Sequence, residues 1–110
     1  MRKTTLGEFE LLVLLATLQL GESNAYAVSI VDEITSRTGR TVRRAAVYTT
    51  LQRLETKGLV TTWLGESRPE RGGKAQRHVR LEPTGLAATA EARAALKNMW
   101  GGLDPMFEET

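Results

Sequence analysis

The sequence predicts a mainly α-helical fold with one small β-hairpin, in a chain of 110 residues. Three observations support this fold class. Three apolar repeats with helical spacing come first, a stretch rich in strand-forming residues follows, and a fourth helical repeat comes last. The length and the hydrophobic fraction of 41% are typical of one globular domain.

The first predicted helix covers residues 6–20 and is apolar on more than one side. In a small domain a second apolar face often meets a partner subunit, so Leu11 and Leu15 are expected at a dimer interface. The run is too short to cross a bilayer, and no signal-peptide cleavage site follows it. The sequence therefore predicts a cytoplasmic protein without a membrane partner.

The second helix is predicted from an apolar repeat over residues 27–34. Ser23 and Asn24 are the expected N-terminal caps, because short polar side chains accept hydrogen bonds from the first free N–H groups. The helix is expected to end near Thr38, since glycine at position 39 favours a helix C-terminus.

The third predicted helix, residues 44–57, has two contrasting faces. Val47, Leu51 and Leu54 share one face and are expected to pack on the domain. The opposite face is open to two interpretations, an ordinary solvated surface or a surface that meets a ligand. It consists of Ala45, Thr49, Gln52 and Thr56, flanked by Tyr48 and Arg53.

A β-hairpin, here called the wing, is predicted over residues 59–81. Its strands are expected at 59–64 and 76–81, where β-branched and aromatic residues gather. The segment 65–75 between them contains Pro69, Gly72 and Gly73, which favour a long hairpin tip. This tip carries Arg68, Arg71 and Lys74.

The last predicted helix begins at Pro83, which suits a first helical turn, and extends to residue 103. Gly101 and Gly102 are expected to break or fray its end. Residues 104–110 are predicted to form a flexible tail. The apolar stripe of this helix is expected to complete the dimer interface with Leu86, Leu96, Met99, Trp100 and Leu103.

The net charge of +2 conceals an uneven distribution. Residues 37–80 carry eleven Lys or Arg against three Glu, a balance of +8, while the segments before and after each carry two cations against five anions. A basic centre between acidic flanks is typical of a site for a polyanion such as DNA.

Three short helices, a basic hairpin and a final helix match a winged helix-turn-helix domain over residues 1–82 with a C-terminal dimerisation helix over 83–103. In this arrangement the third helix enters the major groove and the wing reaches the backbone or the minor groove. The predicted DNA-binding residues are Arg44, Tyr48, Thr49, Gln52 and Arg53 of the third helix, and Arg71, Lys74 and Arg77 of the wing.

Two other functions fit the same pattern. A winged helix also serves as a protein-interaction module, in which case the basic centre would meet an acidic partner. A small-molecule sensor that has lost DNA binding is a weaker alternative, because Tyr48 and the basic wing are retained.

Two segments resemble the PadR family of transcriptional regulators. Residues 46–60, AVYTTLQRLETKGLV, resemble the recognition-helix signature of the family: a tyrosine, leucines three and six positions later, and a glycine followed by two apolar residues. Residues 73–85, GKAQRHVRLEPTG, resemble the wing strand and the entry to the last helix. The resemblance extends from about residue 6 to residue 100 and is most specific around the tyrosine.

The resemblance implies a two-fold dimer on a pseudo-palindromic operator, usually acting as a repressor, with Tyr48 contacting DNA. The short C-terminus resembles the smaller subtype, with a single helix after the wing. Many members release DNA when a small aromatic or hydrophobic effector binds. Trp100 is therefore a candidate to stack on such an effector, and packing in the dimer interface is the alternative role.

The sequence departs from the family pattern at three places. Ala25 replaces the usual glycine before the aromatic residue of the second helix, and His78 with Val79 replaces paired wing tyrosines. Glu82 replaces the threonine that usually caps the last helix, although a carboxylate also favours a helix N-terminus. None of these departures falls in the third helix.

Catalysis and metal binding have little support in the sequence. The chain has no cysteine and one histidine, His78, so neither a thiolate site nor a histidine cluster can be built. The pair Gly72–Gly73 before Lys74 lacks the spacing of a phosphate-binding loop. We therefore expect no enzymatic activity, no cofactor and no metal.

Overall fold

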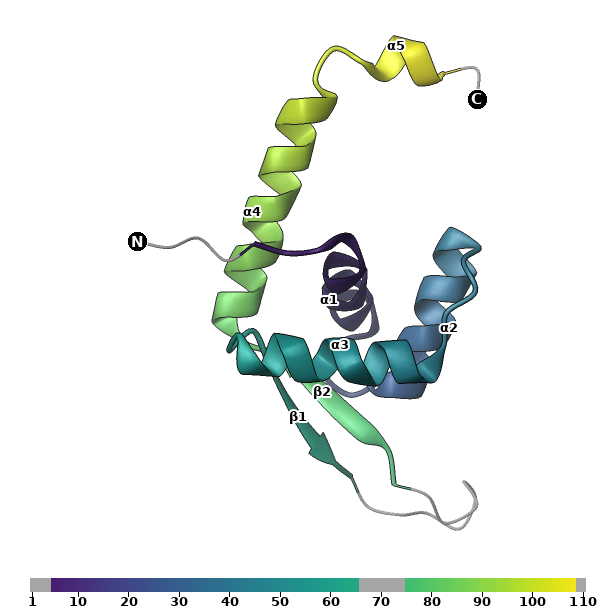
Figure 1. Cartoon of the computed structure of the whole chain (residues 1–110), viewed down its shortest axis with the longest axis vertical. Helices are drawn as coiled ribbons and strands as arrows, with labels where there is room; N and C mark the ends of the chain where they lie inside the picture. Colours follow the sequence, from purple (N-terminus) through teal and green to yellow (C-terminus); the bar gives the residue numbers. More distant parts are fainter. Residues whose placement is uncertain (1–4, 66–74, 109–110) are drawn as a thin grey trace.

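The computed structural model describes residues 5–65 and 75–108. Three helices come first, the wing follows, and a long helix with a short one completes the chain (Figure 1). Within the described residues, the predicted mainly helical fold with an antiparallel hairpin is confirmed. The elements are α1 (Glu8–Leu20), α2 (Ala27–Thr38), α3 (Arg44–Thr56), β1 (Val60–Leu64), β2 (Arg77–Leu81), α4 (Pro83–Trp100) and α5 (Asp104–Phe107).

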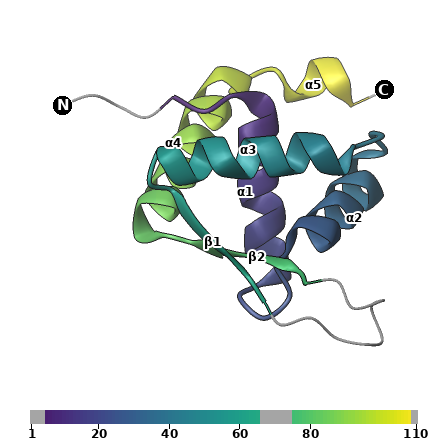
Figure 2. The ribbon, with the colours of Figure 1, turned by 60° about the horizontal axis from the view of Figure 1, so that its bottom comes forward.

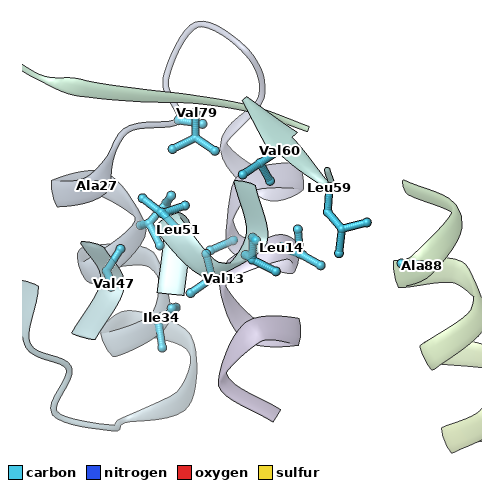
Figure 3. Packing of buried hydrophobic residues seen from close by; sticks show 14 residues of the cluster. Val13, Leu14, Ala27, Ile34, Val47, Leu51, Leu59, Val60, Val79 and Ala88 are labelled. Carbon is cyan, nitrogen blue, oxygen red and sulfur yellow. The ribbon is translucent and has the colours of Figure 1, made fainter. Parts of the chain in front are cut away.

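The core lies where the first three helices meet the wing (Figure 3). Val13 and Leu14 of α1 are fully buried, as is Val79 of β2. From α3, Val47 and Leu51 contribute side chains that are 0% and 2% exposed. The apolar face predicted for α3 is therefore its buried face, which leaves the polar face directed outward.

The wing is a two-stranded antiparallel sheet with a register from Val60 opposite Leu81 to Leu64 opposite Arg77. The edge of β2 that faces away from β1 pairs with the segment before α2. The Val79 N–H donates a hydrogen bond of 3.0 Å to the Ala25 carbonyl, and Tyr26 forms an isolated bridge with His78. These contacts attach β2 to the helical body, so the base of the wing is fixed along both sides of this strand.

The start of α2 differs from the sequence prediction. Tyr26, rather than Ser23 or Asn24, is the N-cap residue. Its backbone N–H donates to the Ser29 hydroxyl at 3.0 Å, and that hydroxyl donates to the Asn24 carbonyl at 2.6 Å. The pairing of Tyr26 with the wing moves the start of the helix to residue 27, and a serine inside the first turn performs the capping.

Helix α4 begins against the body and then continues away from it (Figure 1). Gly85 allows the close approach at its start, because a Cβ atom there would lie 2.2 Å from the Leu59 carbonyl oxygen. The helix ends at Trp100, earlier than the predicted residue 103, and Gly102 adopts a positive φ of 81° in the turn that follows.

The segment predicted to be a tail contains a helical turn, α5. The Phe107 ring packs edge-on against the Trp100 ring with a centroid distance of 5.0 Å. This aromatic contact holds the segment after the glycines against the end of α4. Apolar periodicity did not predict it, because the segment is too short to show a repeat.

Candidate nucleic-acid interface

Helix α3 carries the predicted base-reading side chains on its open side. Figure 2 shows this helix crossing in front of α1, with the wing emerging from its C-terminal end. Tyr48 is 40% exposed although it is a large aromatic residue that directly follows the fully buried Val47. The predicted partners of Tyr48 on this helix are all exposed, namely Arg44, Thr49, Gln52 and Arg53. Helical geometry thus presents five of the eight predicted DNA-binding side chains on one element.

The wing residues divide into two groups. Arg77 lies at the start of β2 and donates a hydrogen bond of 3.4 Å to the Thr62 hydroxyl on β1. Arg71 and Lys74, predicted at the wing tip, lie outside the described residues. Of the three predicted wing contacts, Arg77 at the base of the wing is therefore the one that lies within the described residues.

A hollow of about 290 Å³ lies between α3 and the wing. Its lining combines exposed residues of the helix with the wing base: Tyr48, Leu51, Gln52, Glu55, Thr62 and Arg77. Three predicted DNA-binding residues, Tyr48, Gln52 and Arg77, thus meet around one hollow, although up to 29 positions separate them in the chain.

Of the cations without an ion pair within the described residues, several flank α3, and two others, Arg93 and Lys97, lie on α4. Arg37, Arg40, Lys57 and Arg80 each form an ion pair. Among the described residues, no carboxylate pairs with Arg44, Arg53 or Arg77, nor with Arg43, the N-cap residue of α3. Arg43 lies just outside the third helix predicted from the sequence, residues 44–57, and is not among the predicted DNA-binding residues. Its place immediately before the helix is the signal that could have identified it as a candidate phosphate contact.

The C-terminal end of α3 is anchored to α1 by an ion pair with a buried carboxylate. Lys57 follows the helix, and its Nζ lies 2.9 Å from both carboxylate oxygens of Glu10, a side chain of α1 that is nearly buried. The Gly7 N–H also donates to this carboxylate at 2.8 Å. Burial alone would raise the pKa of Glu10, but these hydrogen bonds and the charges of Lys57 and Arg53 outweigh it and lower that pKa below its ordinary value.

The residues predicted at a dimer interface are open to solvent in the single chain. Leu15 of α1 is exposed, and so are Leu86, Leu96, Met99, Trp100 and Leu103, while Leu11 is half-buried. Leu18, which sequence reasoning left out, is also exposed on α1. Its position one helical turn after Leu15 is the signal that points to it.

The two aromatic residues of the wing form a stack. The Trp63 ring lies parallel to the His78 ring, with a centroid distance of 5.4 Å, and the Arg80 guanidinium lies 5.9 Å from the Trp63 ring centroid. Trp63 packs along the strands rather than in the core, because its side chain is 41% exposed. His78 faces aromatic rings, and no cluster of three candidate metal ligands occurs in the described part of the chain.

None of the helices that the structure describes combines the length and the apolar character needed to cross a membrane.

Comparison with solved structures supports the same fold. A PadR-like transcription factor from Bacteroides fragilis is 21% identical, with a TM-score of 0.69, over 89% of this chain and 88% of that one. A PadR family regulator from Eggerthella lenta is 24% identical, with a TM-score of 0.66, over 90% and 83% of the two chains.

A third similar structure is BpsR from Bordetella bronchiseptica, whose DNA binding is regulated by 6-hydroxynicotinic acid. It is 21% identical, with a TM-score of 0.64, over 96% of this chain and 74% of that one. The comparison with curated proteins gives no match.

The family comparison extends across most of the folded chain. Residues 14–91 match the model of the transcriptional regulator PadR-like family, from the middle of α1 to the middle of α4. This range includes α3 and the wing, where the open polar face and the unpaired cations are found. Regulators of this family bind DNA and are not enzymes. The chain belongs to the PadR-like family of transcriptional regulators.

Proposed function

We propose that this protein is a repressor that binds a pseudo-palindromic operator as a homodimer, with residues 1–82 as the DNA-binding domain. The observation that carries the proposal is the outward polar face of α3, flanked by cations without ion-pair partners in the described residues. Gln52 would read a base edge, while Arg44, Arg53 and Arg77 would fix the register on the phosphates. A cytoplasmic location belongs to the same proposal, because the operator has to be reached.

The dimer is supported by the stripe that α4 carries beyond the body. Gly85, Ala88 and Thr89 of α4 are buried against the domain. The same helical spacing continues through residues 92, 96 and 99 of α4, where Leu96 and Met99 are exposed, and Leu103 just after the helix is exposed as well. A second copy would cover this second half of the stripe, and its own exposed Leu15 and Leu18 offer a matching apolar surface.

A selection experiment tests the repressor proposal. Purified protein would be mixed with random-sequence duplexes, and bound DNA would be amplified and sequenced. We expect enrichment of two inverted half-sites with centres one helical turn, about 34 Å, apart. Absence of any enriched sequence would contradict the proposal and favour a winged helix that binds a protein instead of DNA.

A small aromatic or hydrophobic effector also belongs to the proposal. Trp100 is half-exposed, its ring contacts Phe107, and both lie at the end of the apolar stripe of α4. Regulation of BpsR by 6-hydroxynicotinic acid provides a precedent for a flat aromatic ligand in a protein of similar fold.

Tryptophan fluorescence offers a direct test of this role. The chain has two tryptophans, so Trp63→Phe leaves Trp100 as the only reporter. Saturable quenching by a panel of flat aromatic acids, together with release of operator DNA, would support an effector site at Trp100. Release of DNA without quenching would place the effector elsewhere, and Trp100 would then have a packing role only.

A further inference from the structure

The carboxylate of Glu55 connects the recognition helix to the wing. Glu55 lies in the last turn of α3, and Thr62 lies in the middle of β1. One carboxylate oxygen accepts a hydrogen bond of 3.0 Å from the Thr62 N–H, and the other accepts one of 2.9 Å from the Thr62 hydroxyl. Two bonds from one carboxylate to one residue fix orientation as well as distance.

The backbone donor in this pair belongs to the open edge of the wing. In an antiparallel pair, alternate N–H groups point away from the partner strand. Thr62 lies opposite Val79, and its N–H is directed to Glu55 rather than to β2. Glu55 therefore provides the partner that the strand edge lacks, and the edge is held against α3.

The connection continues to the cation at the wing base. The Thr62 hydroxyl donates to Glu55 and accepts the 3.4 Å bond from the Arg77 guanidinium. Glu55, Thr62 and Arg77 all line the hollow of about 290 Å³ that also contains Tyr48 and Gln52. The Thr62 hydroxyl therefore links Glu55 of α3 to Arg77, a predicted phosphate contact.

The sign of the charge makes this arrangement unusual. Among the described residues, Glu55 is the one carboxylate that lines the hollow, on a surface otherwise suited to a polyanion. Electrostatics alone predicts that this anion weakens DNA binding. The presence of Glu55 is explained if its hydrogen bonds to the wing favour DNA binding more than its negative charge opposes it.

We propose that Glu55 is a positioning residue that sets the angle between the wing and the recognition helix, so that both reach DNA together. This inference rests on the proposed function for its effect on DNA. The clamp itself is a property of the free protein and can be measured there.

The first measurement uses the protein without DNA. Because the chain has no cysteine, nitroxide labels can be placed at Ala46→Cys on α3 and Ala75→Cys before β2, both exposed positions. We expect a narrow distribution of distances between the labels, which broadens in Glu55→Ala and stays narrow in the control Asp32→Ala. An unchanged distribution in Glu55→Ala would overturn the clamp, whether or not the protein binds DNA.

The second measurement uses operator DNA across a salt series. Replacing Glu55 by Ala should weaken binding about tenfold, and the salt slope should fall by about one to two because wing phosphate contacts are lost. Thr62→Val, which retains the N–H but lacks the hydroxyl, should lose part of this affinity, and Thr62→Ser should retain it. Tighter binding by Glu55→Ala with an unchanged slope would show that the carboxylate acts only by repulsion, and would overturn the proposal.

Discussion

At the residue scale, the proposed DNA contacts come from α3 and from the wing and have different roles. Gln52 is exposed in the middle of α3, where an amide side chain can pair with an adenine edge. Arg77 lies at the wing base beside Thr62, and its guanidinium is proposed to contact the DNA backbone, which is the same in every sequence. The two positions should therefore affect binding in different ways.

Substitutions at these two positions separate the roles. Gln52→Ala should cost about 1–3 kcal/mol on the preferred operator and little on a duplex with the contacted base changed. Arg77→Ala should weaken both duplexes alike and reduce the salt slope by about one. Titrations of both variants against both duplexes provide the measurement. Equal weakening of all duplexes by Gln52→Ala would contradict its base-reading role.

The Glu10–Lys57 pair predicts a dependence of stability on pH. The folded pKa of Glu10 lies below its unfolded value, so the stability it contributes is present above that unfolded value, near 4.5, and is lost as the pH falls through the folded pKa. Glu10→Gln should lower the free energy of unfolding by about 1–3 kcal/mol at pH 7, and the deficit should shrink at lower pH. Denaturant titrations between pH 7 and pH 3 check this. If the loss of unfolding free energy in Glu10→Gln stayed constant from pH 7 to pH 3, the ionised Glu10–Lys57 pair would not be its cause.

Several site residues depend on contacts that the sequence does not reveal. Glu10 and Lys57 are 47 positions apart, so their hydrogen bonds arise only when α1 and α3 are packed together. The bond from Glu55 to Thr62 depends on the turn at Gly58, where φ is 76°, and on the direction in which β1 leaves it. Sequence periodicity identifies the face of a helix, but tertiary packing decides which partner that face meets.

At the element scale, the sequence predicted the helices from their apolar repeats and the strands from their β-branched and aromatic residues. The buried residues of α3, for example, are those on its predicted apolar face. Helix ends were less predictable, since Tyr26 starts α2 through a contact with β2 and Phe107 orders α5 through a contact with Trp100. Both contacts join segments whose local patterns carry no sign of the partner.

The junction between the wing and α4 depends on Gly85. A methyl group at this position would meet the Leu59 carbonyl oxygen and the Leu81 side chain. Gly85→Ala should therefore lower the free energy of unfolding by about 1–3 kcal/mol, despite the better helix propensity of alanine. Thermal unfolding compared with that of the exposed control Ala90→Ser tests this. A higher free energy of unfolding in Gly85→Ala would contradict this prediction, because Leu59 and Leu81 would then have moved aside for the methyl group at little cost.

At the scale of the whole molecule, α4 would connect the two DNA-binding units of the proposed dimer. Its first half packs on its own domain and its second half leaves that domain with an apolar stripe exposed (Figure 1). A two-fold pair of chains would bury this stripe and set the spacing between two copies of α3. In this account dimerisation and operator binding are coupled.

Charged substitutions on the stripe test the coupling. Leu96→Glu combined with Trp100→Glu should give a monomer by light scattering, with a folded circular dichroism spectrum and greatly weakened operator binding. The exposed control Ala94→Glu, on the opposite face of the same helix, should leave the dimer intact. A variant with both stripe substitutions that remains dimeric would place the main interface elsewhere.

A direct test asks whether α3 and the wing bind a specific DNA sequence. Fluorescence anisotropy would compare a duplex from the region upstream of the protein's own gene with a scrambled duplex, over a series of salt concentrations. We predict saturable binding that favours the first duplex and weakens steeply with salt, because several cations contact phosphates in each half-site. No binding to either duplex at low salt would contradict DNA binding by α3 and the wing.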